Sequence, residues 1–149
     1  MTEVSFYHLE RTPLKVALPK ILEKAHSAGM RTVVIAGSEE HIAELNAALW
    51  TYDPDSFLPH GTGEDGPAAD QPIYLTTHDE NPNAATVLAL VDGVDVTDFG
   101  KFNRVLDLFD GHDEEAVQAA RGRWKTRMDA GHDLTYWQQT PTGGWEKKA

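Results

Sequence analysis

A cluster of basic residues around one tryptophan is the part of this sequence best suited to binding chemistry. Residues 120–128 contain four cations and no acid, in a chain of 149 residues whose formal net charge is -11. On a helix, positions i, i+3, i+4 and i+7 share one face, and here they hold Arg121, Trp124, Lys125 and Met128. An indole between a guanidinium and an ammonium suits an apolar, anionic ligand, such as the carboxylate end of an acidic peptide with a hydrophobic last residue.

The same stretch also fits a second arrangement, in which its apolar residues are buried. Val117, Ala120, Trp124 and Met128 would then form the core-facing stripe of an amphipathic helix, with the basic residues as solvated flanks. Periodicity alone favours this buried stripe. Charge favours the ligand surface, because so many cations without acids at i±4 are unexpected in so acidic a protein.

The distribution of charge along the sequence limits the classes of molecule that the protein can bind. Residues 39–115 carry eighteen acidic and two basic side chains, a sum of -16, whereas residues 116–149 sum to +3. A surface of this sign repels nucleic acid over most of its area, so we expect no direct nucleic-acid binding. The sequence has no cysteine, no apolar run of membrane-spanning length and no secretion signal, which together predict a cytoplasmic protein without membrane contact.

Apolar patterning predicts strands that alternate with helices. The expected strands are 4–9, 32–36, 72–76, 87–91 and 134–138, and the expected helices carry the apolar stripes of residues 14–25 and 42–49 and the basic stretch. Pro19 predicts that the first helix begins at or just before it, and Ser38 and Asp113 are the expected N-caps of the other two. For residues 99–109 the pattern leaves helix and strand open.

This order of elements predicts an α/β fold, a Rossmann-like three-layer domain with a mostly parallel central sheet flanked by helices. We expect one domain over residues 1–149, with a short flexible tail from about residue 140. The sequence contains neither of the two glycine-rich nucleotide-binding motifs, G-x-x-x-x-G-K-[ST] and G-x-G-x-x-G. The seven histidines lack metal-ligand spacing, so we expect no cofactor and no metal. The fold alone leaves one alternative, a small enzyme with a site at the C-terminal edge of the strands near Gly37, Thr76 and Asp92.

Several motifs, taken in order along the chain, resemble the chi subunit of bacterial DNA polymerase III. They are Phe6-Tyr7-His8-Leu9, residues 29–36, Leu45 with Ala48-Leu49-Trp50, residues 56–61, and residues 120–125 running to Ala130-Gly131. The most specific part is the Leu-Trp pair followed a few residues later by Ser-Phe-x-Pro-His. The resemblance implies a non-catalytic accessory subunit of the clamp-loader assembly that acts in DNA replication.

Chi-like proteins bind the acidic, phenylalanine-ended C-terminal tail of single-stranded DNA-binding protein. The tail-binding positions of the family match Arg121, Trp124 and Lys125. We expect Arg121 to pair with the terminal carboxylate, while Trp124 and Met128 hold the terminal ring and Lys125 and Arg123 attract the upstream aspartates. Val117 stands where well-known members of the family have a lysine, so this pocket is less basic.

Chi-like proteins also bind the psi subunit, which links them to the clamp loader. The resemblance implies that this second partner, or a helicase in its place, binds a face formed by Trp50, Phe57, Pro59 and His60. The alternative for Trp50 and Phe57 is a core role, in which they anchor the loop after the second helix. Both roles are compatible in part, because partly exposed aromatic residues often anchor interfaces.

Overall fold

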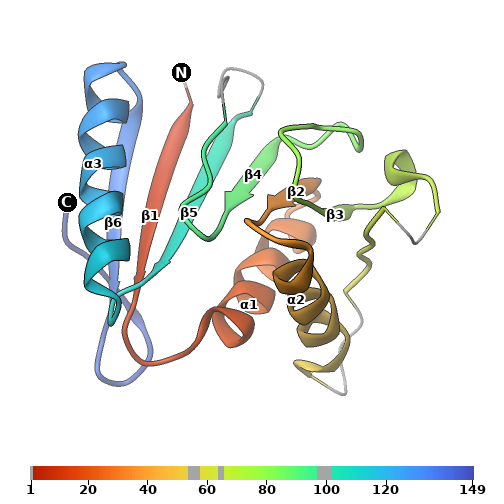
Figure 1. Ribbon diagram of the computed structural model, residues 1–149, viewed down its shortest axis with the longest axis horizontal. Helices are drawn as coiled ribbons and strands as arrows, with labels where there is room; N and C mark the ends of the chain where they lie inside the picture. The colour runs from red at the N-terminus through yellow and green to blue at the C-terminus, as the bar shows by residue number, and fades with distance from the viewer. Residues whose placement is uncertain (1, 54–57, 64–65, 97–101) are drawn as a thin grey trace.

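The computed structural model describes residues 2–53, 58–63, 66–96 and 102–149, and within them three α-helices flank a seven-stranded sheet (Figure 1). In chain order, the elements are β1 (Glu3–Leu9), α1 (Leu14–Ser27), β2 (Thr32–Ile35), α2 (Glu39–Thr51), the 3-10 helix η1 (Ala68–Asp70), β3 (Ile73–Thr76), β4 (Val87–Leu90), β5 (Arg104–Asp110), α3 (Glu114–Asp129), β6 (Asp133–Gln139) and β7 (Trp145–Lys147). The predicted α/β class is confirmed. None of the described helices is both long and apolar enough to span a membrane.

The strand order is β3-β2-β4-β5-β1-β6-β7, and every neighbouring pair is parallel except β6 with β7. From β1 the chain crosses through α1 towards β2, and from β5 it crosses in the opposite direction through α3 to β6. Right-handed crossovers that run in opposite directions place their helices on opposite faces of a sheet. In Figure 1, α3 accordingly lies against the β1–β6 side, while α1 and α2 lie towards β2 and β3.

Two clusters of buried side chains, one on each face of the sheet, form the core between the sheet and its helices. Leu106 of β5 packs in the cluster that includes Leu22 of α1, whereas its neighbour Val105 packs in the cluster that Trp124 of α3 joins. This alternation follows from the strand geometry, in which successive side chains point to opposite faces. Strands buried on both faces are expected to be apolar throughout, and all four residues of β4 are buried.

The N-caps of α2 and α3 agree with the sequence prediction. The Ser38 hydroxyl accepts a hydrogen bond from the backbone N–H of His41 at 3.2 Å, and the Asp113 carboxylate accepts from the backbone N–H groups of Glu115 and Ala116. Each cap satisfies amide groups that have no partner inside the helix. Residues 99–109, which the pattern left open, contain strand β5 from Arg104 onwards.

The prediction for the start of α1 was wrong. The helix begins at Leu14, so Pro19 lies inside it rather than in its first turn. Pro19 gives up one backbone hydrogen bond to the carbonyl of Lys15. Pro19 is itself buried, and the apolar stripe that holds α1 on the sheet already begins at Leu14. Burial of this stripe therefore outweighs the lost bond.

Part of the segment from about residue 140, which the sequence predicts to be a flexible tail, forms β7 in the structure. Thr140 and Gly144 close a turn in which Gly143 has φ +91°, a conformation that glycine adopts without strain. The chain then runs back along β6, and the Trp145 ring packs edge-on against Tyr7 with 5.1 Å between ring centroids. A glycine-rich turn followed by tryptophan is thus a hairpin here.

Candidate functional site

The four cations of the basic stretch divide into two pairs on α3. Arg121 and Lys125 are exposed, whereas the Arg127 side chain is only 4% exposed and that of Arg123 only 11%. Residues two apart on a helix point in nearly opposite directions, and residues four apart point the same way. One pair therefore faces solvent and the other faces the sheet.

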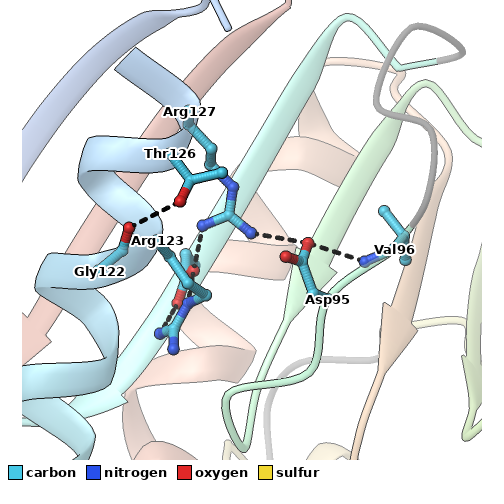
Figure 2. Close-up of polar contacts among 7 residues, drawn as sticks. Asp95, Val96, Gly122, Arg123, Thr126 and Arg127 are labelled. Atoms are coloured by element: carbon cyan, nitrogen blue, oxygen red, sulfur yellow. Dashed lines mark hydrogen bonds and ion pairs between the residues drawn. The ribbon is translucent and has the colours of Figure 1, made fainter. Parts of the chain in front are cut away.

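The inward pair belongs to a buried ion network (Figure 2). Asp107 of β5, which is 2% exposed, accepts hydrogen bonds from Arg123 Nε at 2.7 Å and Arg123 Nη2 at 2.9 Å, one on each carboxylate oxygen. Arg127 donates to Asp107 through Nη1 and to Asp95 through Nη2, both at 3.0 Å. Bidentate geometry of this kind fixes orientation as well as charge, so the network holds α3 in one position on the sheet.

The network changes the role expected for Arg123. The sequence predicts that Arg123 attracts the aspartates of a ligand, whereas in the structure its guanidinium is paired with Asp107 inside the protein. The pairing of Arg123 and Arg127 with Asp107 is not among the predictions from the sequence. A signal was present, because Asp107 is the one charge within the apolar run Val105-Leu106-Asp107-Leu108-Phe109, and a buried carboxylate requires a cation or hydrogen-bond donors.

Trp124 lies at the boundary between core and surface. Its ring is half-buried and contacts Phe6 edge-on at 5.3 Å and Tyr136 at 5.8 Å between centroids. Ala120 is buried, as the stripe arrangement predicted, but Met128 is 53% exposed and does not belong to the core. Each of the two sequence-based arrangements therefore describes part of α3.

The outward face of α3 retains unmatched positive charge. The structure gives neither Arg121 nor Lys125 an ion pair or hydrogen bond with any other described residue. Val117 is partly buried beside them and packs against the same cluster as Trp124. We define the α3 docking surface as Val117, Arg121, Trp124, Lys125 and Met128. Its chemistry is a half-exposed aromatic ring and a thioether between two available cations.

A polar cluster on β1 and β6 lies within the electrostatic reach of Arg121. His8 Nδ1 is 2.6 Å from the Tyr136 hydroxyl, and His8 Nε2 is 3.2 Å from Glu10 Oε1. Burial lowers the pKa of His8, against the opposing effect of Glu10, and the charge of Arg121 lowers that pKa further. Burial raises the pKa of Tyr136. Both side chains are therefore neutral near pH 7, and Arg121 carries the positive charge beside them.

The second predicted face is partly described. Trp50 is 56% exposed, and its ring centroid lies 4.7 Å from that of His60, which is 7% exposed. His60 Nδ1 donates a hydrogen bond to the Leu58 carbonyl at 2.7 Å, and Pro59 is half-buried. Phe57 lies outside the described residues. The structure thus packs the exposed ring of Trp50, at the end of α2, against the buried ring of His60.

The residues of the enzyme alternative are engaged within the protein. Asp92 Oδ2 accepts from the Gly37 backbone N–H at 2.9 Å and lies 2.6 Å from His41 Nδ1, so it ties the end of β4 to the start of α2. Thr76 instead donates to Glu80. No group of three or more histidine, aspartate or glutamate side chains within the described ranges is arranged to hold a metal ion. Gly37 and Asp92 are therefore adjacent, but their contacts hold a loop in place.

Comparison with known proteins gives one consistent family. A model of the family described as "DNA polymerase III chi subunit, HolC" matches residues 1–135. The chain is 30% identical over 109 residues to the probable DNA polymerase III subunit chi of Rickettsia prowazekii, a match that covers 73% of this chain and 66% of that protein. It is 26% identical over 108 residues to DNA polymerase III subunit chi of Escherichia coli, covering 72% and 73% of the two chains. The protein of the same name from Pseudomonas aeruginosa is 28% identical over 139 residues, covering 90% and 94%.

Proposed function

This chain belongs to the DNA polymerase III chi subunit family, and we propose from that premise that it binds the acidic C-terminal tail of single-stranded DNA-binding protein. Proteins of this family are non-catalytic accessory subunits of the polymerase. The observation that carries the proposal is the α3 docking surface, where Arg121 and Lys125 are exposed beside a half-buried Trp124 while the neighbouring arginines are matched internally. The family motif predicts the tail-binding role for Arg121, Trp124 and Lys125, which lie on this surface.

Each exposed group of the α3 docking surface has a distinct task in the proposed complex. The Arg121 guanidinium pairs with the terminal carboxylate as a planar fork. The outer rim of Trp124 and the side chain of Met128 hold the terminal aromatic ring, because both offer apolar surface that is still open to solvent. Lys125 attracts the upstream aspartates, and salt screens this contribution. Arg123 contributes indirectly, by holding α3 against Asp107.

The test is a titration with a short acidic peptide that ends in Pro-Phe, at low salt. A hydrogen bond to a charged group is worth about 1.5–3 kcal/mol, so Arg121→Ala is expected to weaken binding by roughly tenfold or more. Lys15→Ala is the matched control, because Lys15 is exposed on α1 and is not part of the α3 docking surface. Equal affinity of the wild type and Arg121→Ala would remove Arg121 from the site.

We further propose that the protein bridges this tail to the clamp loader in the cytoplasm through the psi subunit. Trp50, whose ring contacts that of His60, supplies an exposed aromatic anchor of the kind that dominates protein interfaces. Trp50→Ala is expected to abolish co-purification with psi while leaving binding of the tail peptide unchanged. Loss of both activities would point to unfolding, and retention of psi would exclude Trp50 as the anchor.

A further inference from the structure

A second basic, aromatic surface lies on the opposite face of the sheet from α3. Helix α1 packs against β2, β5 and α2, and the β1–β6–β7 end of this face has no helix across it within the described residues (Figure 1). Tyr7 is paired with Trp137 across β1 and β6, and Gln139 with Trp145 across β6 and β7. Residues directly opposite each other share a face, so these three aromatic rings lie on one side of the sheet.

Two recesses follow α1 along this surface. Their volumes are about 350 Å³ and about 140 Å³, and both are lined by Ile21, Lys24 and Trp145. The larger recess adds Tyr7, Trp137 and Arg104, and the smaller adds Lys20 and the exposed Val16. The shared residues show that the two recesses adjoin along the helix, and together they form a groove with aromatic walls.

The groove is positively charged although the protein is strongly acidic. Lys20, Lys24 and Arg104 line it, and no aspartate or glutamate does so within the described residues. Arg104 Nη2 lies 3.8 Å from Glu3, at the outer limit for an ion pair, and Arg104 Nε is buried without a hydrogen-bond partner. The Arg104 side chain as a whole is 39% exposed, so a ligand carboxylate can approach its guanidinium from the groove.

The spacing of the cations indicates what kind of chain fits. Lys20 and Lys24 are one turn apart, about 6 Å along the helix axis. Side chains on one side of an extended peptide repeat at about 6.6 Å, so alternate residues of such a peptide can meet successive lysines. The aromatic walls are half-buried and enclose recesses, whereas bases stack on open aromatic platforms. A net charge of -11 also repels a long polyanion such as single-stranded DNA.

We propose that this groove, which we name the α1 groove, binds an extended acidic peptide segment with aromatic or large apolar side chains at alternate positions. Its carboxylates pair with Lys20, Lys24 and Arg104, and its apolar side chains enter the recesses beside Trp137 and Trp145. The α1 groove lies on the other side of the sheet from Arg121 and requires no chain terminus. The protein therefore has two independent docking faces for acidic partners, and loss of binding at one face is not expected to affect binding at the other.

The test uses the full chain and a fluorescently labelled peptide, Asp-Phe-Asp-Phe-Asp-Phe-Asp, whose C-terminus is amidated to remove the carboxylate that the α3 docking surface would bind. Fluorescence anisotropy at low salt is expected to show binding that weakens by roughly tenfold or more in the double variant Lys20→Glu/Lys24→Glu, because two attractive contacts become repulsive. Both lysines are exposed, so the fold should persist, which circular dichroism checks.

Two control variants separate the α1 groove from other surfaces. Lys15→Glu makes the same type of charge reversal at one exposed position of α1 outside the groove and is expected to retain nearly full affinity, as is Arg121→Ala on the other face. Equal binding by the wild type and the double variant would overturn the proposal, as would loss of binding in Arg121→Ala. Tighter binding of an unlabelled oligothymidylate than of the peptide, measured by competition, would assign the groove to single-stranded DNA instead.

Discussion

Replacement of Asp107 by asparagine is expected to be among the most destabilising single changes in this protein. Asp107 is 2% exposed and accepts three hydrogen bonds from two guanidiniums, at 2.7, 2.9 and 3.0 Å. Asp107→Asn keeps the shape of the side chain but removes its charge and one acceptor. Arg127 then keeps its hydrogen bond to Asp95, whose side chain is 57% exposed, and Arg123 loses its carboxylate partner.

The magnitude follows from the burial of the cations. Breaking a buried ion pair by removing one partner costs about 3–5 kcal/mol, because an uncompensated charge stays inside the protein. Asparagine keeps one acceptor oxygen and Arg127 keeps Asp95, so we expect the low end, about 3 kcal/mol. In a domain of this size each kcal/mol lowers Tm by about 2–4 °C, which gives a decrease of about 6–12 °C.

Urea unfolding followed by circular dichroism measures the free energy of unfolding directly, and a thermal scan gives Tm. Asp110→Asn is the matched control, because Asp110 ends the same strand but is exposed. Its Oδ1 accepts from the His112 backbone N–H, a bond that the asparagine oxygen can keep, so the control should change stability by less than about 0.5 kcal/mol. A loss below about 1 kcal/mol in Asp107→Asn would refute a network that anchors α3.

Three further changes test separate parts of the structure. Burial lowers the pKa of His8 below its usual 6.5, so the unfolded chain binds the proton more tightly than the folded protein does. The free energy of unfolding therefore falls as the pH drops below about 6.5. The decrease in Tm from pH 7.5 to pH 5.5 should be smaller in His8→Gln than in the wild type. Val117→Lys should tighten binding of the Pro-Phe peptide at low salt by up to about 1 kcal/mol, and titration at high salt should remove the gain. Asp113→Ala should destabilise the protein by about 1 kcal/mol in urea, because α3 loses its N-cap, and an unchanged midpoint would contradict the cap.

The layers of the fold are predictable because their signals are local. Apolar runs such as residues 87–91 identify buried strands, and Ser38 and Asp113 cap helices through amides within three positions of themselves. The misjudged segments lack such a signal. Pro19 is tolerated inside α1 because of tertiary burial, and the polar turn before Trp145 forms a hairpin because β6 offers a free edge.

The candidate site was only half predictable, for a physical reason. A helical repeat gives the relative directions of side chains on α3 but not which direction faces the sheet. The buried face contains Ala120 and Arg127, seven residues apart, and an arginine is buried there only because Asp107 and Asp95 come to it from other elements. Hydrophobic periodicity cannot find a buried cation, so the sequence overcounted the cations available to a ligand.

The most direct test of the central claim is a double-mutant cycle between Arg121 and the chain end of the ligand. The affinities of the wild type and Arg121→Ala are measured by calorimetry for the Pro-Phe peptide, once as the free acid and once as the C-terminal amide. We expect amidation to weaken binding to the wild type by roughly tenfold and to leave Arg121→Ala almost unaffected, which is a coupling of about 1–2 kcal/mol. An equal effect of amidation on both proteins would contradict the claim that the Arg121 guanidinium on α3 binds the terminal carboxylate.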